Sequence, residues 1–172
     1  MKLPDIRLPR QLEAEGASET IRRALMDHTV KLWPGGNIDV PLITMDDSLK
    51  KVLQTARYKG QVRCGFEAIS DKLASERKGI ANVREHTGAP YGDRISRLLL
   101  FSNDGAERFY RHIEHLLQMH APRLLGCRLD IDSDTLGHLI TGKDSRIKIV
   151  MAEYKEVVSE ILRTLVTGHD EL

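Results

Sequence analysis

The residues best suited to bind another molecule lie in Val62–Lys72, where a short apolar segment passes through Gly65 into an amphipathic helix. Glycine permits the tight backbone path between the two elements. Arg63, Glu67 and Ser70 stand around the start of this helix, where the first backbone N–H groups bind phosphate readily. The stretch contains no acid–base pair, nucleophile or set of metal ligands. It therefore predicts recognition rather than catalysis.

Phe66, at the start of the same helix, has two interpretations. Its spacing to Ile69 and Leu73 forms one apolar stripe, which would place it in the core. An aromatic side chain beside Arg63 and Glu67 could instead stack on an unpaired base. Core packing is favoured, and base stacking stays open.

Two other clusters have the residue types of metal ligands. His112, His115 and His120, with Met119, could suggest a metal site on the helix at 106–120, and the spacing of His112 and His115 could place them on one face. No cysteine or carboxylate completes a zinc pattern. Asp130, Asp132 and Asp134 alternate like the start of a calcium loop, without its glycine and closing glutamate at the required spacing. Surface or packing roles for the histidines and helix capping for the aspartates are favoured, so no metal or other cofactor is predicted.

Two further motifs contain residue types found in nucleotide-binding loops or in catalytic sites. Thr141–Ser145 has the glycine, lysine and serine of a phosphate loop, but it follows a helix and precedes a strand, the reverse of the Walker arrangement. Asp104 and Glu107 follow an apolar strand, as carboxylates of doubly wound enzymes do. No partner base or nucleophile accompanies them, and capping or shaping of a binding loop is favoured. The chain is therefore not expected to be an enzyme.

The charge of the chain is concentrated in its middle. The 172 residues carry a net charge of only +1, so the whole chain is not a polybasic nucleic-acid binder. From Ser48 to Arg97, however, eleven Lys or Arg residues stand against five Asp or Glu residues, an excess of six. This distribution predicts one positive face, although an ordinary solvated helix surface explains it equally well.

The cysteines and the apolar segments predict the compartment. Cys64 and Cys127 are too few for a disulfide scaffold or a zinc site, and are expected to be reduced and buried. The sequence has no apolar run of 18 residues, so no membrane-spanning helix is expected. The N-terminus has Pro4 and Pro9 with acidic residues instead of the apolar region of a signal peptide. A cytoplasmic protein without membrane contact is expected.

Hydrophobic periodicity predicts alternating helices and strands. Helices are expected at 18–28, 48–58, 66–77, 106–120, 133–141 and 153–165, and strands at 29–33, 38–43, 62–64, 97–102, 124–129 and 147–151. Residues 79–96, with three glycines and Pro90, are expected to form a long loop. The alternation predicts an α/β fold, a three-layer α/β/α sandwich with a small mixed sheet over residues 47–168. Residues 1–46 are expected to be an N-terminal extension with a polar arm, a helix and a β-hairpin.

Three segments resemble the kink-turn-binding ribosomal protein superfamily, an RNA-binding α/β/α sandwich of archaeal and eukaryotic ribosomal and box C/D proteins and small bacterial homologues. Val52–Glu67 is similar to the family's approach to its RNA-facing helix. Leu99–Asp104 is similar to the strand and turn that follow, and Ser133–Lys143 to the family's "LG-x-x-x-GK" helix. The resemblance covers about Leu49 to Leu165. Phe66 and Ser70 stand where the family has Asn and Lys.

The resemblance implies a non-catalytic protein that binds structured RNA, such as rRNA, within a ribosome, another ribonucleoprotein or a transcription complex. Cations would hold phosphates, and a recognition edge would contact a kinked or unstacked segment. The residues expected at this site are Lys59, Arg63, Gly65, Phe66, Glu67, Ser70, Lys72, Ser102, Asn103, Asp104, Asp130 and Ile131. The alternative is a protein–protein interaction module on the same scaffold with the RNA edge lost, which the replaced family residues and the near-neutral total charge favour.

Overall fold

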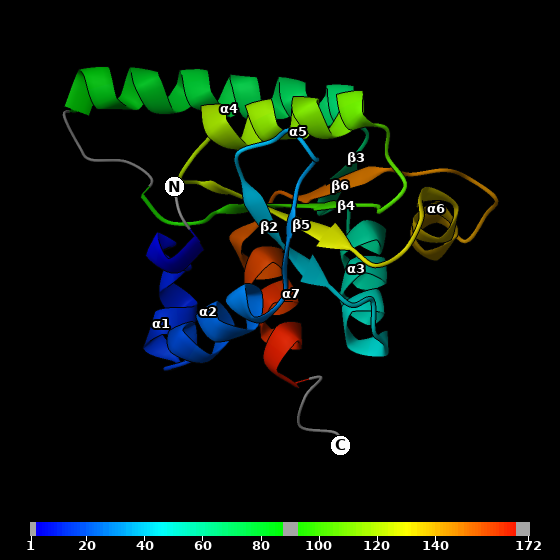
Figure 1. Cartoon of the computed structure of the whole chain (residues 1–172). Coiled ribbons are helices and arrows are strands. Elements are labelled where there is room, and N and C mark those ends of the chain that lie inside the picture. Colours follow the sequence, from blue (N-terminus) through cyan, green and yellow to red (C-terminus); the bar gives the residue numbers. More distant parts are fainter. Residues whose placement is uncertain (1–2, 88–92, 168–172) are drawn as a thin grey trace.

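In a computed structural model that describes residues 3–87 and 93–167, seven α-helices surround a six-stranded mixed sheet (Figure 1). After a short 3-10 turn at Leu3–Asp5, the helices are α1 (Arg10–Ala14), α2 (Ser18–Asp27), α3 (Asp47–Tyr58), α4 (Phe66–Thr87), α5 (Glu107–Met119), α6 (Ser133–Thr141) and α7 (Lys155–Thr167). The strands are β1 (Thr29–Lys31), β2 (Asp39–Ile43), β3 (Val62–Cys64), β4 (Arg97–Phe101), β5 (Leu124–Leu129) and β6 (Ile149–Ala152). None of the helices in these ranges is long and apolar enough to cross a membrane.

The sheet has the strand order β1-β2-β5-β4-β6-β3. The directions of its strands define two edges of the sheet, where the strands begin and end, and these matter for the site. Strands β2, β5 and β4 are parallel, and β3 runs in the same direction because both β3 and β4 pair antiparallel with β6. These four strands end at one edge, here called the carboxyl edge, and begin at the opposite one, the amino edge. Strand β6 runs the other way, so it begins at the carboxyl edge and ends at the amino edge.

Helices cover both faces of the sheet, which confirms the α/β/α sandwich. Helices α4 and α5 lie over one face, and α1, α2, α3 and α7 lie over the other, with α6 beside α3 (Figure 1). Side chains of β4 alternate between the two cores, since Leu98 and Leu100 face α7 whereas Leu99 and Phe101 face α5. Burial on both faces explains why this strand is a continuous apolar run instead of an alternating one.

The first 46 residues contribute to the same sheet and the same core as the rest. Strands β1 and β2 form the predicted antiparallel hairpin, and β2 then pairs parallel with β5 through Leu42 and Arg128. The described part of the arm buries Ile6, Leu8 and Leu12 in the core that α3 and α7 share. Its short helix α1 was not expected from the sequence, because five residues are too few to display a helical period.

The predicted end of the central helix is wrong. Helix α4 continues through Gly79 to Thr87, so residues 79–87 of the expected loop are helical. A glycine inside a helix costs only about 1 kcal/mol relative to alanine, and the surrounding Ala, Arg, Lys and Glu residues favour the helix. Residues 88–92 of the expected loop lie outside the described ranges. Ile95 and Ser96 are buried immediately before β4.

Polar contacts tie the hairpin to α5 and β5. The Trp33 indole N–H donates to the carboxylate of Glu114, a buried residue of α5, and the backbone N–H of Asn37 donates to its other oxygen at 3.4 Å. The Arg128 guanidinium donates to the Leu32 carbonyl at 2.5 Å and stacks 4.6 Å from the Tyr110 ring centre. Glu114 is therefore an acceptor for two hairpin donors.

Candidate functional site

The carboxyl edge assembles the recognition loops expected from the sequence. The Gly65 N–H donates to the Ile149 carbonyl at 3.2 Å, and the Ser102 N–H donates to the Lys148 carbonyl at 2.9 Å. The Asn103 N–H in turn donates to the Ile131 carbonyl at 2.9 Å. These backbone bonds join the ends of β3, β4 and β5 to the start of β6. The structure thus brings together Gly65, Phe66, Glu67, Ser102, Asn103, Asp104, Asp130 and Ile131.

The side chains at this edge differ in their availability to a ligand. Phe66 is half-buried against the α5 core, with its ring centre 5.6 Å from that of His112, so core packing accounts for it. Ser102 is fully buried, whereas Glu67 and Asn103 are exposed. Ser70 lies half-buried one turn further along α4. Asp104 and Asp130 are exposed as well, so four of the predicted polar side chains at this edge are open to solvent, and three of these are carboxylates.

Aspartates dominate the charge of the carboxyl edge, and five of them bond neighbouring elements. Asp46 and Asp132 accept from the backbone N–H groups of Leu49 and Thr135, at 2.8 and 2.7 Å, and so cap α3 and α6. The predicted cap of α6, Ser133 or Asp134, is therefore one or two residues too late. Three further aspartates brace loops, through bonds of Asp130 to Met45, Asp104 to Ser133 and Asp134 to Arg146. An edge built in this way repels a phosphate backbone.

The pKa values of two of these aspartates predict an acid-sensitive stability. Desolvation raises the pKa of Asp104, but the hydrogen bonds from the Ser133 hydroxyl and backbone N–H outweigh it and leave the pKa below its ordinary value. Hydrogen bonds from Thr135 lower the pKa of Asp132. A carboxylate with a lowered folded-state pKa stabilises the fold above its unfolded pKa and loses this effect as the pH falls through the folded value. We expect stability to fall below about pH 4.

Thermal unfolding between pH 2 and pH 7 measures this contribution. In Asp104→Asn, which cannot titrate, the decrease in Tm between pH 4 and pH 2 should be smaller than in the wild type, with a lower Tm at pH 7. The matched control is Asp71→Asn, which replaces an exposed carboxylate on α4. Its decrease in Tm between pH 4 and pH 2 should equal that of the wild type. If Asp104→Asn also showed the wild-type decrease, Asp104 would not be a source of the acid sensitivity.

The cationic residues expected at the same site lie elsewhere. Lys59 follows the end of α3, immediately before the strand β3 begins, and so lies at the amino edge. The Arg63 guanidinium reaches Glu153, which follows the end of β6, with nitrogen–oxygen distances of 2.9 and 3.4 Å. Lys72 lines a depression of about 360 Å³ with Glu76 and other residues of this end. The structure therefore divides the predicted site, with its loops at one edge and its cations toward the other.

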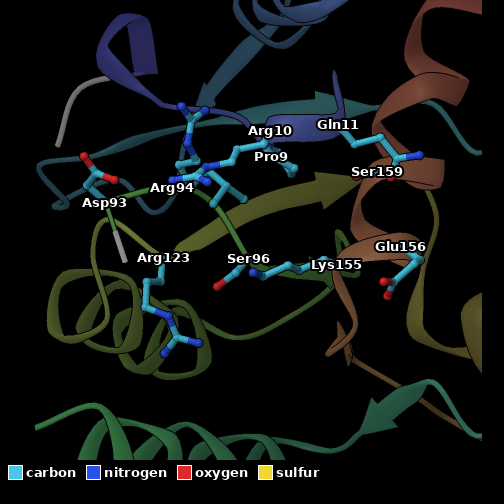
Figure 2. Close-up of a pocket in the computed structure, with 11 residues that line it drawn as sticks. Pro9, Arg10, Gln11, Asp93, Arg94, Ser96, Arg123, Lys155, Glu156 and Ser159 are labelled. Atoms are coloured by element: carbon cyan, nitrogen blue, oxygen red, sulfur yellow. The ribbon is translucent and has the colours of Figure 1, made fainter. Parts of the chain in front are cut away.

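A larger cleft of about 510 Å³ lies at the amino edge (Figure 2). It is framed by the start of α1, the approach to β4, the start of β5 and the first turn of α7. Four cations line it, namely Arg10, Arg94, Arg123 and Lys155, against the two carboxylates Asp93 and Glu156. The cleft is therefore basic.

Ion pairs hold part of this cationic lining in place. Arg94 donates to the Leu8 carbonyl at 2.9 Å and lies 3.0 Å from a Glu13 oxygen, which also lowers the pKa of Glu13. Glu76 of α4 receives both Arg97, at 3.0 Å, and Arg123, at 3.5 Å. One carboxylate shared by two guanidinium groups leaves an excess of positive charge beside the cleft.

Helix α4 extends the basic surface beyond the cleft. Its distal half carries exposed Arg77, Lys78 and Arg84. Burial lowers the pKa of His120 near the end of α5, and the charges of Arg77 and Arg123 lower it further. Arg77 and Arg123 therefore act on the same buried imidazole although they belong to different elements. Arg123 at the start of β5 also contacts Glu76 of α4 at 3.5 Å, so this end of α4 lies beside the cleft.

Sequence reasoning did not find the four cations of the cleft. Arg10, Arg94, Arg123 and Lys155 are spread over 146 positions of the chain and form no local motif. The excess of basic residues in the middle segment included Arg94 but neither the arm nor α7. Arg94, Arg123 and Lys155 stand within three residues of the start of an expected helix or strand, but Arg10 begins the unexpected helix α1, so the four share no common signal in the sequence.

The described residues offer little for redox or metal chemistry. They contain no group of three or more His, Cys, Asp or Glu side chains that could hold a metal ion. Both cysteines are free thiols, and Cys127 is buried as expected, whereas Cys64 is only half-buried. Burial raises the pKa of Cys64 and, more strongly, that of Cys127, so both are protonated at neutral pH.

Comparisons with known proteins give no family. No family model matches the chain, and no curated protein matches it. A solved structure described as a protein with unknown function from Bacillus halodurans C aligns over 73% of this chain and 100% of its own, with 15% sequence identity and a TM-score of 0.42. The resemblance to kink-turn-binding proteins stays a prediction.

Proposed function

We propose that the protein is a non-catalytic binder of structured RNA and that it holds the RNA backbone at the amino edge of its sheet. The observation that carries this proposal is the basic cleft between α1, β4, β5 and α7, together with the exposed cations on the distal half of α4. A surface of this kind attracts phosphates along a length of backbone and gives an affinity that falls with added salt.

The separation of charge between the two edges supports this location. The carboxyl edge carries capping and bracing aspartates, so an RNA backbone is repelled there. Lys59 and Lys72, two of the cations expected from the sequence, lie on the side of the basic surface. A polyanion approaching in solution is therefore steered toward the amino edge.

Charge reversal at the cleft tests the proposal. In Arg10→Glu, Lys155→Glu, affinity for a structured RNA that contains a kink-turn should fall at least about tenfold near 0.1 M salt, and the dependence of log Kd on log salt should become shallower by about 1.5 units, because two phosphate contacts are lost. Both side chains are exposed, so the fold should be preserved. Fluorescence anisotropy across a salt series measures both quantities.

The matched control reverses two exposed lysines on other elements, Lys50 of α3 and Lys143 after α6. The variant Lys50→Glu, Lys143→Glu has the same net charge as the cleft variant and should bind within about twofold of the wild type at the same salt. An equal loss of RNA affinity in the two double variants would show that the effect comes from net charge and not from the cleft. Absence of measurable binding by the wild type would refute the function itself.

The second candidate is a protein–protein interaction module. Val83 on the distal half of α4 and Met119 at the end of α5 remain 39% and 41% exposed. Large apolar side chains on a projecting helix are suited to a partner surface. Light scattering and nuclease-treated pull-downs distinguish the candidates, because a stable complex that survives nuclease treatment supports this one.

A further inference from the structure

We infer that the amino-edge cleft binds a phosphomonoester, the terminal phosphate of an RNA strand or of a free nucleotide. For the RNA end, this inference rests on the proposed function. It adds that the cleft selects a phosphate at the end of a chain over the phosphodiesters within it. Three features of the cleft support it: its surplus charge, an unbonded buried hydroxyl and its concave shape.

The surplus charge of the cleft matches a dianion. Six cations stand in and around it, namely Arg7, Arg10, Arg94, Arg97, Arg123 and Lys155. The carboxylates beside these cations are Glu13, Glu76, Asp93 and Glu156. The six cations therefore exceed the carboxylates by two positive charges. A phosphomonoester carries about −1.5 to −2 at pH 7, whereas a diester carries only a single charge. The cleft is therefore electrostatically better matched to a terminal phosphate.

Arg10 and Lys155 are the cations available to such a ligand. Neither forms an ion pair within 4 Å with any residue in the described ranges. Figure 2 shows Lys155 extending from the start of α7 toward Ser96, with Arg123 on the other side of Ser96, and Arg10 near Arg94 at the far end of the cleft. Asp93 and Glu156 lie toward opposite sides of this view.

Ser96 supplies a donor that the described part of the protein leaves unused. The residue is only 7% exposed, and its hydroxyl has no hydrogen-bond partner among the described residues. Its backbone is fixed, because its N–H donates to the Arg123 carbonyl at 3.0 Å and its carbonyl accepts from Arg97 at 2.7 Å. A buried donor without a partner is unfavourable, and an oxygen of a phosphate in the cleft would satisfy it.

The shape of the cleft and the helix beside it favour a chain end. A volume of about 510 Å³ accommodates a nucleotide. An internal phosphodiester would have to bring a nucleotide on each side into the same hollow, whereas a terminal phosphate enters with one. The first turn of α7 opens onto the cleft at Lys155 and Glu156, and the amino end of a helix attracts anions.

The test compares one structured RNA with a 5′-terminal phosphate and with a 5′-terminal hydroxyl, and adds a nucleoside monophosphate as a third ligand. The full chain should bind the phosphorylated RNA at least about fivefold more tightly at fixed salt, because the second charge and the Ser96 donor are used only there. In Ser96→Ala and in Lys155→Ala this preference should disappear. Lys78→Ala, on exposed α4, should weaken both RNAs equally and keep the preference.

The outcomes separate the inference from the proposed function. Equal affinities for the two RNAs by the wild type would overturn the inference and leave RNA binding intact. Binding of the nucleoside monophosphate without binding of either RNA would support the phosphomonoester site and refute the RNA function. A preference that persists in both Ser96→Ala and Lys155→Ala would also overturn the inference, and the exposed Lys155 keeps this comparison valid if Ser96→Ala folds poorly.

Discussion

Replacing Gly137 by alanine should destabilise the protein by about 3 kcal/mol or more, one of the two largest effects predicted from the structure. Gly137 is buried in α6, and a methyl group on its Cα would lie 1.9 Å from the Ser145 carbonyl oxygen and 3.0 Å from the Ile147 backbone nitrogen. These are backbone atoms, which cannot rotate away as a side chain does. The segment after α6 must therefore move, although it leads directly into β6.

Denaturant unfolding followed by circular dichroism measures the effect, with Gly79→Ala as the control. Gly79 is also a helical glycine, but nothing lies within 4 Å of an added methyl group there. Because alanine favours a helix, Gly79→Ala should stabilise the protein by about 0.5–1 kcal/mol. Unfolding of Gly137→Ala at the wild-type midpoint would contradict the packing of α6. A destabilised Gly79→Ala would contradict the continuation of α4.

Removing the carboxylate of Glu114 should cost about 2–3 kcal/mol, the second large effect. Glu114→Ala leaves the half-buried Trp33 indole N–H and the Asn37 backbone N–H without the buried carboxylate that accepts from both. It also removes one contact between the hairpin turn and α5, while the stacking of Arg111 on Trp33 at 4.6 Å remains. Trp33 is the only tryptophan of the chain, so its fluorescence reports this contact directly. Its emission should shift to longer wavelength as the indole gains water.

Two further variants make this result specific. Glu114→Gln keeps an acceptor oxygen and should recover much of the lost stability and most of the emission shift. Glu160→Ala removes an exposed glutamate of α7 and should change stability by no more than about 0.5 kcal/mol. Equal behaviour of Glu114→Ala and Glu160→Ala would show that Glu114 does not hold the hairpin.

The two edges of the sheet explain how binding and stability are separated in this protein. At the carboxyl edge, Asp46, Asp104 and Asp132 accept hydrogen bonds from the backbone N–H groups of helix starts. At the amino edge, Arg10 and Lys155 are held by no ion pair with a described residue. Carboxylates that cap and brace are expected to affect folding, whereas the exposed cations are expected to affect binding. The acid-stability and RNA-binding experiments address these roles separately.

Local patterns in the sequence were sufficient for most elements. The apolar repeat of Leu49, Leu53 and Ala56 marked α3, and these side chains are buried. The run Leu98–Phe101 indicated a strand covered on both faces, as β4 is. Both patterns arise from neighbouring residues that share one environment, so no distant contact is needed to interpret them. The end of α4 was missed because one glycine weakens a helix without stopping it.

The sequence by itself determined the succession of helices and strands, and with it the α/β/α class, because helical and strand periods are set by residues a few positions apart. Only the tertiary structure decided which residues meet. Strand β2 pairs with β5, whose paired residues lie 86 positions further along the chain. Strand β6 ends at the amino edge, so α7 begins there. Sheet order and strand direction depend on contacts between distant segments. They separated the predicted loops from their cations, and they gathered Arg10, Arg94, Arg123 and Lys155 around one cleft.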